Sequence, residues 1–212
     1  MAALDFKKTD RELYRPGTTP GLIDVPSMLF VAIRGKGNPN IVDGEYARAL
    51  ASLYAIAYTI RMSARSGRAI DGFFEYVVPP LEGLWWMADG SAGVDYDRKD
   101  DFHWISMIRL PDFVTEEIFR WAQEEAARKK GIDTGRAERV VWREGLCVQC
   151  LHTGSYDSEP ETIARMDRFV EENGFRLDFS DTRRHHEIYL GDPRKTAPDK
   201  LRTVIRHPIV RT

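Results

Sequence analysis

Several marks of familiar protein classes are scarce or missing in this sequence. Its 212 residues include two cysteines, too few for a disulfide framework or a four-thiolate zinc site. No apolar run approaches the roughly 20 residues that span a bilayer, and residues 1–8 lack the apolar core of a signal peptide. Neither charge sign dominates, because 31 basic residues face 33 acidic ones, so no polyanionic partner is indicated. Together these absences predict a cytoplasmic protein.

Common catalytic motifs are missing as well. Gly35-Lys36-Gly37 has neither the spacing nor the Lys-Ser/Thr ending of a phosphate-binding loop and predicts a turn. No Gly-x-Ser-x-Gly sequence occurs, so serine hydrolase chemistry has no support. Cys147 and Cys150 have the spacing of a redox pair but fall in a predicted strand. Their side chains should therefore face opposite ways, and we expect both to be core residues.

The hydrophobic pattern predicts an α+β fold whose second half repeats the plan of the first. Each half should contain a strand, a glycine turn, a helix and further strands, which gives tandem β-α-β-β modules. Helices are expected after Asp43, between Thr115 and Lys130, and from a capping box at Ser158-Glu159-Pro160-Glu161. We expect these helices on one side of an antiparallel sheet. Strands are predicted at 28–33, 72–78, 84–87, 102–108, 146–152, 185–190 and 203–207.

The turn-rich start of the chain reads as an extension to a single domain. We predict that residues 1–24 form this extension and that residues 25–212 form the domain. Within the domain, the predicted parts are module one at about 25–110, a linking helix at about 115–130, and module two at about 138–210.

The stretch His185-His186-Glu187-Ile188-Tyr189-Leu190 predicts a strand that ends at Gly191-Asp192-Pro193. Alternation places His185, Glu187 and Tyr189 on one face, and the other three side chains on a core face. The adjacent histidines diverge, unlike the two histidines four residues apart in zinc-protease helices. A metal set with His152 would need the fold to bring distant residues together, so we expect no metal and no cofactor.

A generous supply of aromatic side chains could surround the carboxylate of Glu187. Adjacent Trp85 and Trp86 cannot face the same side of a strand, so one of them should be exposed or line a cleft. Flat aromatic faces around one acid favour a pocket for a planar, apolar or cationic ligand. The candidates are Phe73, Tyr76, Trp85, Trp86, Trp104, Trp142, Tyr156 and Tyr189.

Three segments, residues 79–86, 107–115 and 185–193, together resemble the stand-alone branch of the GyrI-like small-molecule-binding family. The likeness covers roughly residues 20–210. It implies two β-α-β-β modules of the SHS2 type, related by a pseudo-twofold axis, with a ligand in the central cleft. Effector domains of multidrug-responsive transcription activators share this fold.

The resemblance also implies a function. Members of the stand-alone branch hydrolyse the strained cyclopropane of planar DNA-alkylating antibiotics of the yatakemycin and duocarmycin type, which makes them detoxifying resistance enzymes. Two alternatives are a non-catalytic protein that sequesters planar apolar or cationic ligands, and an inhibitor that contacts gyrase. About two dozen leading residues cannot hold a helix-turn-helix unit, so no direct DNA binding is expected. Both a monomer and a homodimer stay open.

By the same resemblance, Glu187 matches the buried acid of the effector domains and is expected to act as general base. Tyr189 is expected to donate a hydrogen bond to the developing phenolate, with Tyr156 as the alternative donor. Glu75 is the alternative acid. The predicted catalytic residues are therefore Glu187 and Tyr189, and the predicted ligand-binding residues are Trp86, Trp104, Tyr156, Phe73, Glu75 and Trp142.

Overall fold

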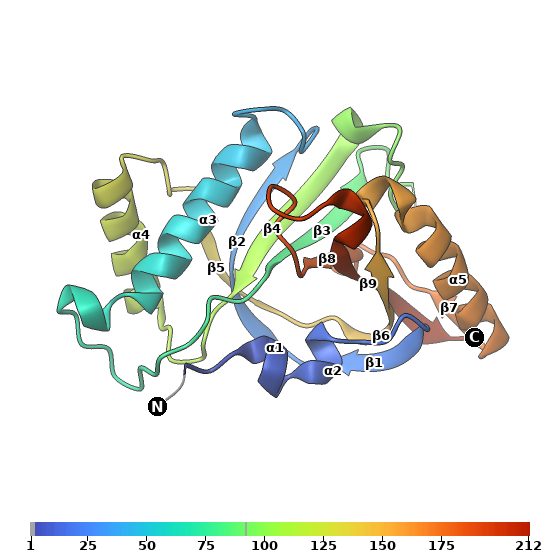
Figure 1. Ribbon diagram of the computed structural model, residues 1–212, viewed down its shortest axis with the longest axis horizontal. Coiled ribbons are helices and arrows are strands. Elements are labelled where there is room, and N and C mark those ends of the chain that lie inside the picture. The colour runs from blue at the N-terminus through green and yellow to red at the C-terminus, as the bar shows by residue number, and fades with distance from the viewer. Residues whose placement is uncertain (1–2, 92) are drawn as a thin grey trace.

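The computed structural model describes residues 3–91 and 93–212, and within them nine strands form one curled antiparallel sheet (Figure 1). Helices cover one face of this sheet, so the predicted α+β class is confirmed. Along the sheet the order is β1-β6-β9-β8-β3-β4-β2-β5, with β7 beside β9. The strands are β1 (Gly21–Val25), β2 (Met28–Lys36), β3 (Leu81–Met87), β4 (Phe102–Arg109), β5 (Glu138–Trp142), β6 (Gly145–Thr153), β7 (Phe175–Leu177), β8 (His185–Tyr189) and β9 (Arg202–Arg211).

The strand order is symmetric about the central pair β8 and β3, which supports the predicted two-module plan. β9, β6 and β1 continue on one side of this pair, and β4, β2 and β5 continue on the other. The two outer strands are exchanged. β1 directly precedes β2 in the chain but pairs with β6, whereas β5 directly precedes β6 but pairs with β2. Connections of two residues, 26–27 and 143–144, therefore draw the two ends of the sheet together and curl it.

Three long helices cover the same face of the sheet (Figure 1). α3 (Glu45–Arg61) and α4 (Glu116–Lys130) lie over the half that contains β2 and β4, and α5 (Glu159–Glu172) lies over the half that contains β6. α4 begins and ends as predicted, because the Thr115 hydroxyl accepts from the Ile118 amide and Gly131 adopts the left-handed conformation with φ 65°. None of the helices in residues 3–91 and 93–212 is both long and apolar enough to cross a membrane.

The opposite face of the sheet holds a second core that includes the start of the chain. The short helices α1 (Phe6–Thr9) and α2 (Arg11–Tyr14) bury Phe6, Leu13 and Tyr14 there. The residues before 25 thus contribute packing to the domain, and the predicted boundary at residue 25 stays a prediction. Short 3-10 turns complete the chain: η1 (Ala64–Ser66), η2 (Lys99–Asp101), η3 (Tyr156–Ser158) and η4 (Pro198–Lys200).

Two local predictions were wrong. Residues 72–78 form no strand and make only an isolated bridge between Tyr76 and Leu4. Phe73 and Tyr76 gave this segment the appearance of a strand, but they pack into the core of the opposite face from an irregular segment. α5 starts at the predicted position, but the Ser158 hydroxyl does not cap it. That hydroxyl instead donates to the Ser155 carbonyl at 2.7 Å.

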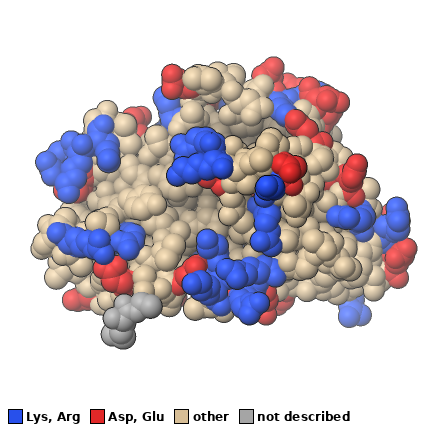
Figure 2. All heavy atoms as spheres, viewed as in Figure 1, with Lys and Arg blue, Asp and Glu red and all other residues tan. Residues whose placement is uncertain are grey.

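Charged side chains of both signs are interspersed over the face shown in Figure 2, without a continuous field of one sign. This distribution agrees with the formal net charge of -2. The two cysteines are free and buried on opposite faces, Cys147 in the core beneath the N-terminal helices and Cys150 beneath α5.

A glycine on β2 makes room for the largest fully buried side chain, Trp104. A Cβ built on Gly35 would lie 2.2 Å from the Trp104 ring, so Gly35→Ala should lower the free energy of unfolding by about 1–3 kcal/mol. Chemical denaturation measures this loss. The matched control is Gly21→Ala, also in a strand, where a Cβ meets nothing within 4 Å. Equal stability of the two variants would contradict the expected clash.

Candidate active site

Strand β8 directs three polar side chains toward the helix-covered face, as its alternation predicted. His185, Glu187 and Tyr189 lie on this face, and Glu187 stands directly opposite Gly83 of the neighbouring strand β3. The absence of a side chain at Gly83 leaves room for the Trp85 indole and the Tyr189 hydroxyl. A Cβ there would approach these groups to 2.5 and 3.1 Å.

A second carboxyl group meets Glu187 from the start of α5. Glu159 is fully buried, and one of its carboxyl oxygens lies within 4.8 Å of a carboxyl oxygen of Glu187. The Tyr96 hydroxyl lies 2.6 Å from Glu159 Oε2 and 3.5 Å from Glu187 Oε1. Tyr96 comes from the loop between β3 and β4, so three separate parts of the chain build this acid pair.

The two carboxyl groups differ in their protonation. Burial and the nearby charge of Glu187 raise the pKa of Glu159 well above its usual value. Burial also opposes charge on Glu187, but hydrogen bonds from His185, Tyr189 and Glu159 outweigh it and hold that pKa below its usual value. The two environments therefore favour a proton on Glu159 and a negative charge on Glu187.

Neutral phenols and an indole form the rest of the site. Trp85 Nε1 donates to the Tyr189 hydroxyl at 2.9 Å, and the charge of Glu187 acts on Tyr189 from the same strand face. The Tyr156 ring packs edge-on against Tyr189 with centroids 5.6 Å apart. Tyr46 on α3 packs against Trp85 at 5.4 Å. Burial raises the pKa of Tyr189 well above its usual value and that of Tyr156 to about 12, so both phenols are proton donors at neutral pH.

The structure brings together only some of the predicted site residues. Tyr189, Tyr156 and Glu187 meet, and Trp104 shares their face but is fully buried behind the edge of Tyr46. Trp86 alternates to the opposite face, where it packs between Arg34 and Arg184.

The other predicted residues lie elsewhere. Phe73 and Trp142 pack in the core of the opposite face, and Glu75 forms an ion pair with Arg61 at 3.3 Å.

The sequence did not assign Glu159, Tyr96 or Tyr46 to the site, and of the two adjacent tryptophans it assigned Trp86 rather than Trp85. Glu159 was visible only as part of a helix start, and its full burial inside that start is a property of the tertiary fold. Tyr96 lies in an irregular loop, where no periodicity assigns a direction to a side chain.

Ligand atoms of Glu159, His185 and Glu187 lie within 4.8 Å of one another, a spacing that a divalent cation could bridge. Hydrogen bonds already engage these groups, since His185 Nε2 lies 2.9 Å from Glu187 Oε1 and the Tyr96 hydroxyl lies 2.6 Å from Glu159 Oε2. Each group of the cluster therefore has a hydrogen-bond partner of its own.

A hollow of about 430 Å³ opens on the outer side of Tyr96. Tyr96 lines this hollow, while its hydroxyl reaches the acid pair. Lys99, which follows the Tyr96 loop, and Asp157 in η3 both line this hollow. They form an ion pair at 2.6 Å that joins the two segments. Tyr96 thus separates the acid pair from the surface.

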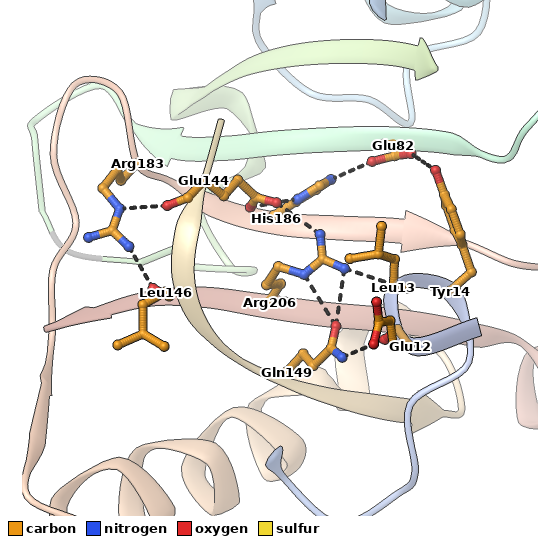
Figure 3. A network of polar contacts seen from close by, with 10 residues as sticks. All are labelled: Glu12, Leu13, Tyr14, Glu82, Glu144, Leu146, Gln149, Arg183, His186 and Arg206. Carbon is orange, nitrogen blue, oxygen red and sulfur yellow. Dashed lines mark hydrogen bonds and ion pairs between the residues drawn. The ribbon is translucent and has the colours of Figure 1, made fainter. Parts of the chain in front are cut away.

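Behind the acid pair, on the opposite face of the sheet, lies a buried charged network (Figure 3). His186, the neighbour of Glu187 in β8, stands between two carboxylates, 2.8 Å from Glu144 and 3.0 Å from Glu82. Arg206 pairs with Glu144 at 2.8 Å and donates to the Leu13 carbonyl. The network therefore ties β8 to the centre of the sheet and to the N-terminal helices.

The ionisation states in this network support one another. Burial alone would raise the pKa of Glu144 and favour its neutral form, but the nearby His186 and Arg206 lower this pKa to about 2. Burial likewise opposes a proton on His186, yet Glu144 and Glu82 raise its pKa to about 9. We conclude that His186 is a cation at neutral pH and holds the back of the strand that carries Glu187.

Several known proteins share this fold. A crystal structure of a hydrolase from Listeria innocua is 44% identical and covers 98% of this chain and 100% of its own, with a TM-score of 0.89. An uncharacterized conserved protein from Listeria innocua is 46% identical with the same coverage and a TM-score of 0.90. The EcmrR C-terminal domain, 15% identical with a TM-score of 0.52, covers 92% of this chain and 98% of its own and shares the fold alone. No curated protein matches the chain.

The family model for the GyrI-like small molecule binding domain matches residues 18–210, nearly the whole chain. The fold with its symmetric strand order and the three motif segments agree with this match. The protein therefore belongs to the family of GyrI-like small-molecule-binding domains.

Proposed function

We propose that the protein is a hydrolase that opens the strained cyclopropane of planar DNA-alkylating compounds by adding water. The observation that carries this proposal is the buried acid pair, whose surroundings raise the pKa of Glu159 and lower the pKa of Glu187. Environments that push two neighbouring acids apart in pKa are typical of sites that perform acid and base steps together. The 44% identical Listeria innocua protein described as a hydrolase supports the reaction class.

In the proposed reaction, Glu187 acts as the base and removes a proton from water as the water oxygen attacks a cyclopropane carbon. The carbon–oxygen bond forms, the strained carbon–carbon bond breaks, and its electron pair moves through the dienone to the ketone oxygen. Tyr189 donates a hydrogen bond to that oxygen without ionising, because its pKa is raised. Glu159 supplies the proton, and the proton on Glu187 then returns to Glu159 within the acid pair.

The aromatic side chains give the site its preference for flat ligands. Tyr46, Tyr156 and Trp85 present rings beside the acid pair, and such rings bind planar apolar compounds. For the ligand to reach Glu187, the Tyr96 hydroxyl has to leave the acid pair. We expect the protein to act as a resistance enzyme in the cytoplasm, where it would destroy the alkylator before it reaches DNA.

Turnover of a cyclopropane-dienone alkylator tests this function. Mass spectrometry should detect a product heavier by one water molecule with the native protein and none with heat-denatured protein. A chelator should leave the rate unchanged, since each group of the acid cluster has a hydrogen-bond partner of its own. Saturable quenching of Trp fluorescence with unchanged ligand would instead identify a binding and sequestering protein.

A further inference from the structure

The hydrogen bonds of the acid pair continue through two histidines toward α5. His185 Nε2 contacts Glu187 Oε1 at 2.9 Å, and His185 Nδ1 contacts His207 Nε2 at 2.7 Å. His207 belongs to β9, the strand that pairs with β8. Both imidazole rings are buried, and the Phe179 ring packs edge-on against His207 at 5.0 Å. The two rings therefore form a continuous polar path inside an apolar surrounding.

The path ends at a partly exposed carboxylate. His207 Nδ1 lies 3.9 Å from Asp167 Oδ1 on α5, and neither atom has a hydrogen-bond partner. The Asp167 side chain is 41% exposed, whereas that of Glu187 is 7% exposed. Glu187, His185, His207 and Asp167 thus connect the buried acid pair with the surface of α5.

The charged groups that face this path are acidic. Glu187 and Glu159 lie at its inner end, and Asp167 with its helix neighbour Glu171 lies at its outer end. An excess proton on the path is therefore attracted from both ends. Burial and the adjacent His185 lower the pKa of His207 well below its usual value, so a proton passes through His207 rather than resting there.

The two rings have two complete hydrogen-bond patterns that differ by one proton. In the neutral pattern, His185 Nε2–H donates to Glu187 and His207 Nε2–H donates to His185 Nδ1. With one more proton, His185 donates from both nitrogens, and the remaining N–H of His207 points toward Asp167. A single passage of a proton needs only these exchanges, and both rings must return to their first tautomers before the next proton passes.

We propose that His185 and His207 form a proton relay that connects the Glu187–Glu159 pair with solvent at α5. A proton enters at His207 Nδ1, the His207 Nε2 proton moves to His185 Nδ1, and the His185 Nε2 proton moves to Glu187. One proton enters at His207 and one proton reaches Glu187, and no group is oxidised or reduced. The kinetic role rests on the proposed function: the reaction starts from a pair with one proton, and the relay lets that proton exchange with solvent before ligand enters, while Tyr96 covers the other side.

His207→Gln tests the relay, because the amide can still donate to His185 Nδ1 but cannot pass a proton on. His103→Gln, on the strand face that packs against Trp86, is the matched control. We expect His207→Gln to lower kcat roughly tenfold and to shift the pH profile, and His103→Gln to change neither. Equal pH profiles for His207→Gln and wild type would overturn the proposal.

A second readout does not depend on turnover. Nitrogen NMR of the two rings should show that the tautomers of His185 and His207 switch together in the wild type. Asp167→Asn, on the partly exposed surface of α5, should shift the balance between the two tautomer patterns and serves if His207→Gln does not fold. Tautomers that change independently of each other would refute the relay, whether or not the protein hydrolyses the tested compound. Tautomers that switch together without any turnover would keep the relay and refute the hydrolase.

Discussion

Replacing Glu187 with Gln should lower kcat for cyclopropane opening by about 10²–10⁴-fold, the usual contribution of a general base. Gln keeps the shape of the side chain and removes the only ionised member of the acid pair. Ligand binding should persist, because the surrounding rings of Tyr46, Tyr156 and Trp85 are unchanged. Single-turnover mass spectrometry measures the rate, and Trp fluorescence quenching measures the binding.

Two further variants make this result specific. Glu159→Gln should also slow turnover, but through the proton donor, so the alkaline limb of the pH profile should change rather than the acid limb. Glu75→Gln is the control, since this partly exposed acid pairs with Arg61 far from the site. Turnover that survives in Glu187→Gln but fails in Glu75→Gln would move the chemistry to Glu75.

Replacing Arg206 with Met should lower the free energy of unfolding by about 3–5 kcal/mol, the cost of breaking a buried ion pair from one side. Arg206 is fully buried and pairs with Glu144, whose side chain is only 7% exposed, so little solvent could replace the guanidinium. The Arg206 guanidinium also donates a hydrogen bond to the Leu13 carbonyl, so the loss of Arg206 should loosen the packing of the N-terminal helices. Urea unfolding followed by circular dichroism measures the change.

Arg120→Met is the matched control for this loss. Arg120 pairs with Glu116 along the exposed surface of α4, with side chains 72% and 57% exposed. Such pairs contribute about 0.3–0.5 kcal/mol, so the control should remain close to wild type. Adding Glu144→Gln to Arg206→Met should recover part of the stability, because the unpaired charge disappears. Similar small losses for both arginine variants would refute the buried network as a source of stability.

The same network predicts how stability depends on pH. The pKa of His186 rises from its usual 6.5 to about 9 in the folded protein, so its contribution is complete below 6.5 and is lost as pH rises through 9. The pKa of Glu144 falls from 4.5 to about 2, so its contribution is complete above 4.5 and is lost as pH falls through 2. The free energy of unfolding, measured across pH, should therefore be highest between pH 4.5 and pH 6.5, where both contributions are complete.

Local patterns predicted the parts of this fold that local forces determine. The alternation in β8 placed Glu187 and Tyr189 on one face, and the caps of α4 defined its ends. The outer strands β1 and β5 were not predicted, because each is short and pairs with a strand from the other module. Such non-local pairing leaves little trace in the sequence around it.

The site was harder to predict than the fold. Alternation shows that Trp85 and Trp86 diverge, but it does not show which of them faces Glu187 until the register with β4 and β8 is known. Glu159 joins Glu187 only through the packing of α5 on the sheet, and Tyr96 only through the path of an irregular loop. The resemblance supplied the key acid, and the tertiary structure supplied its partner.

The exchange of β1 and β5 also governs how a ligand enters. Many two-lobed proteins admit ligands by a hinge motion that swings the lobes apart. Here that motion would break the central β3–β8 pairing and strain the two-residue connections β1–β2 and β5–β6, because each module holds a strand of the other. Entry must therefore proceed by local rearrangement of the Tyr96 loop, and its speed should depend on the Lys99–Asp157 ion pair rather than on the rigidity of the sheet.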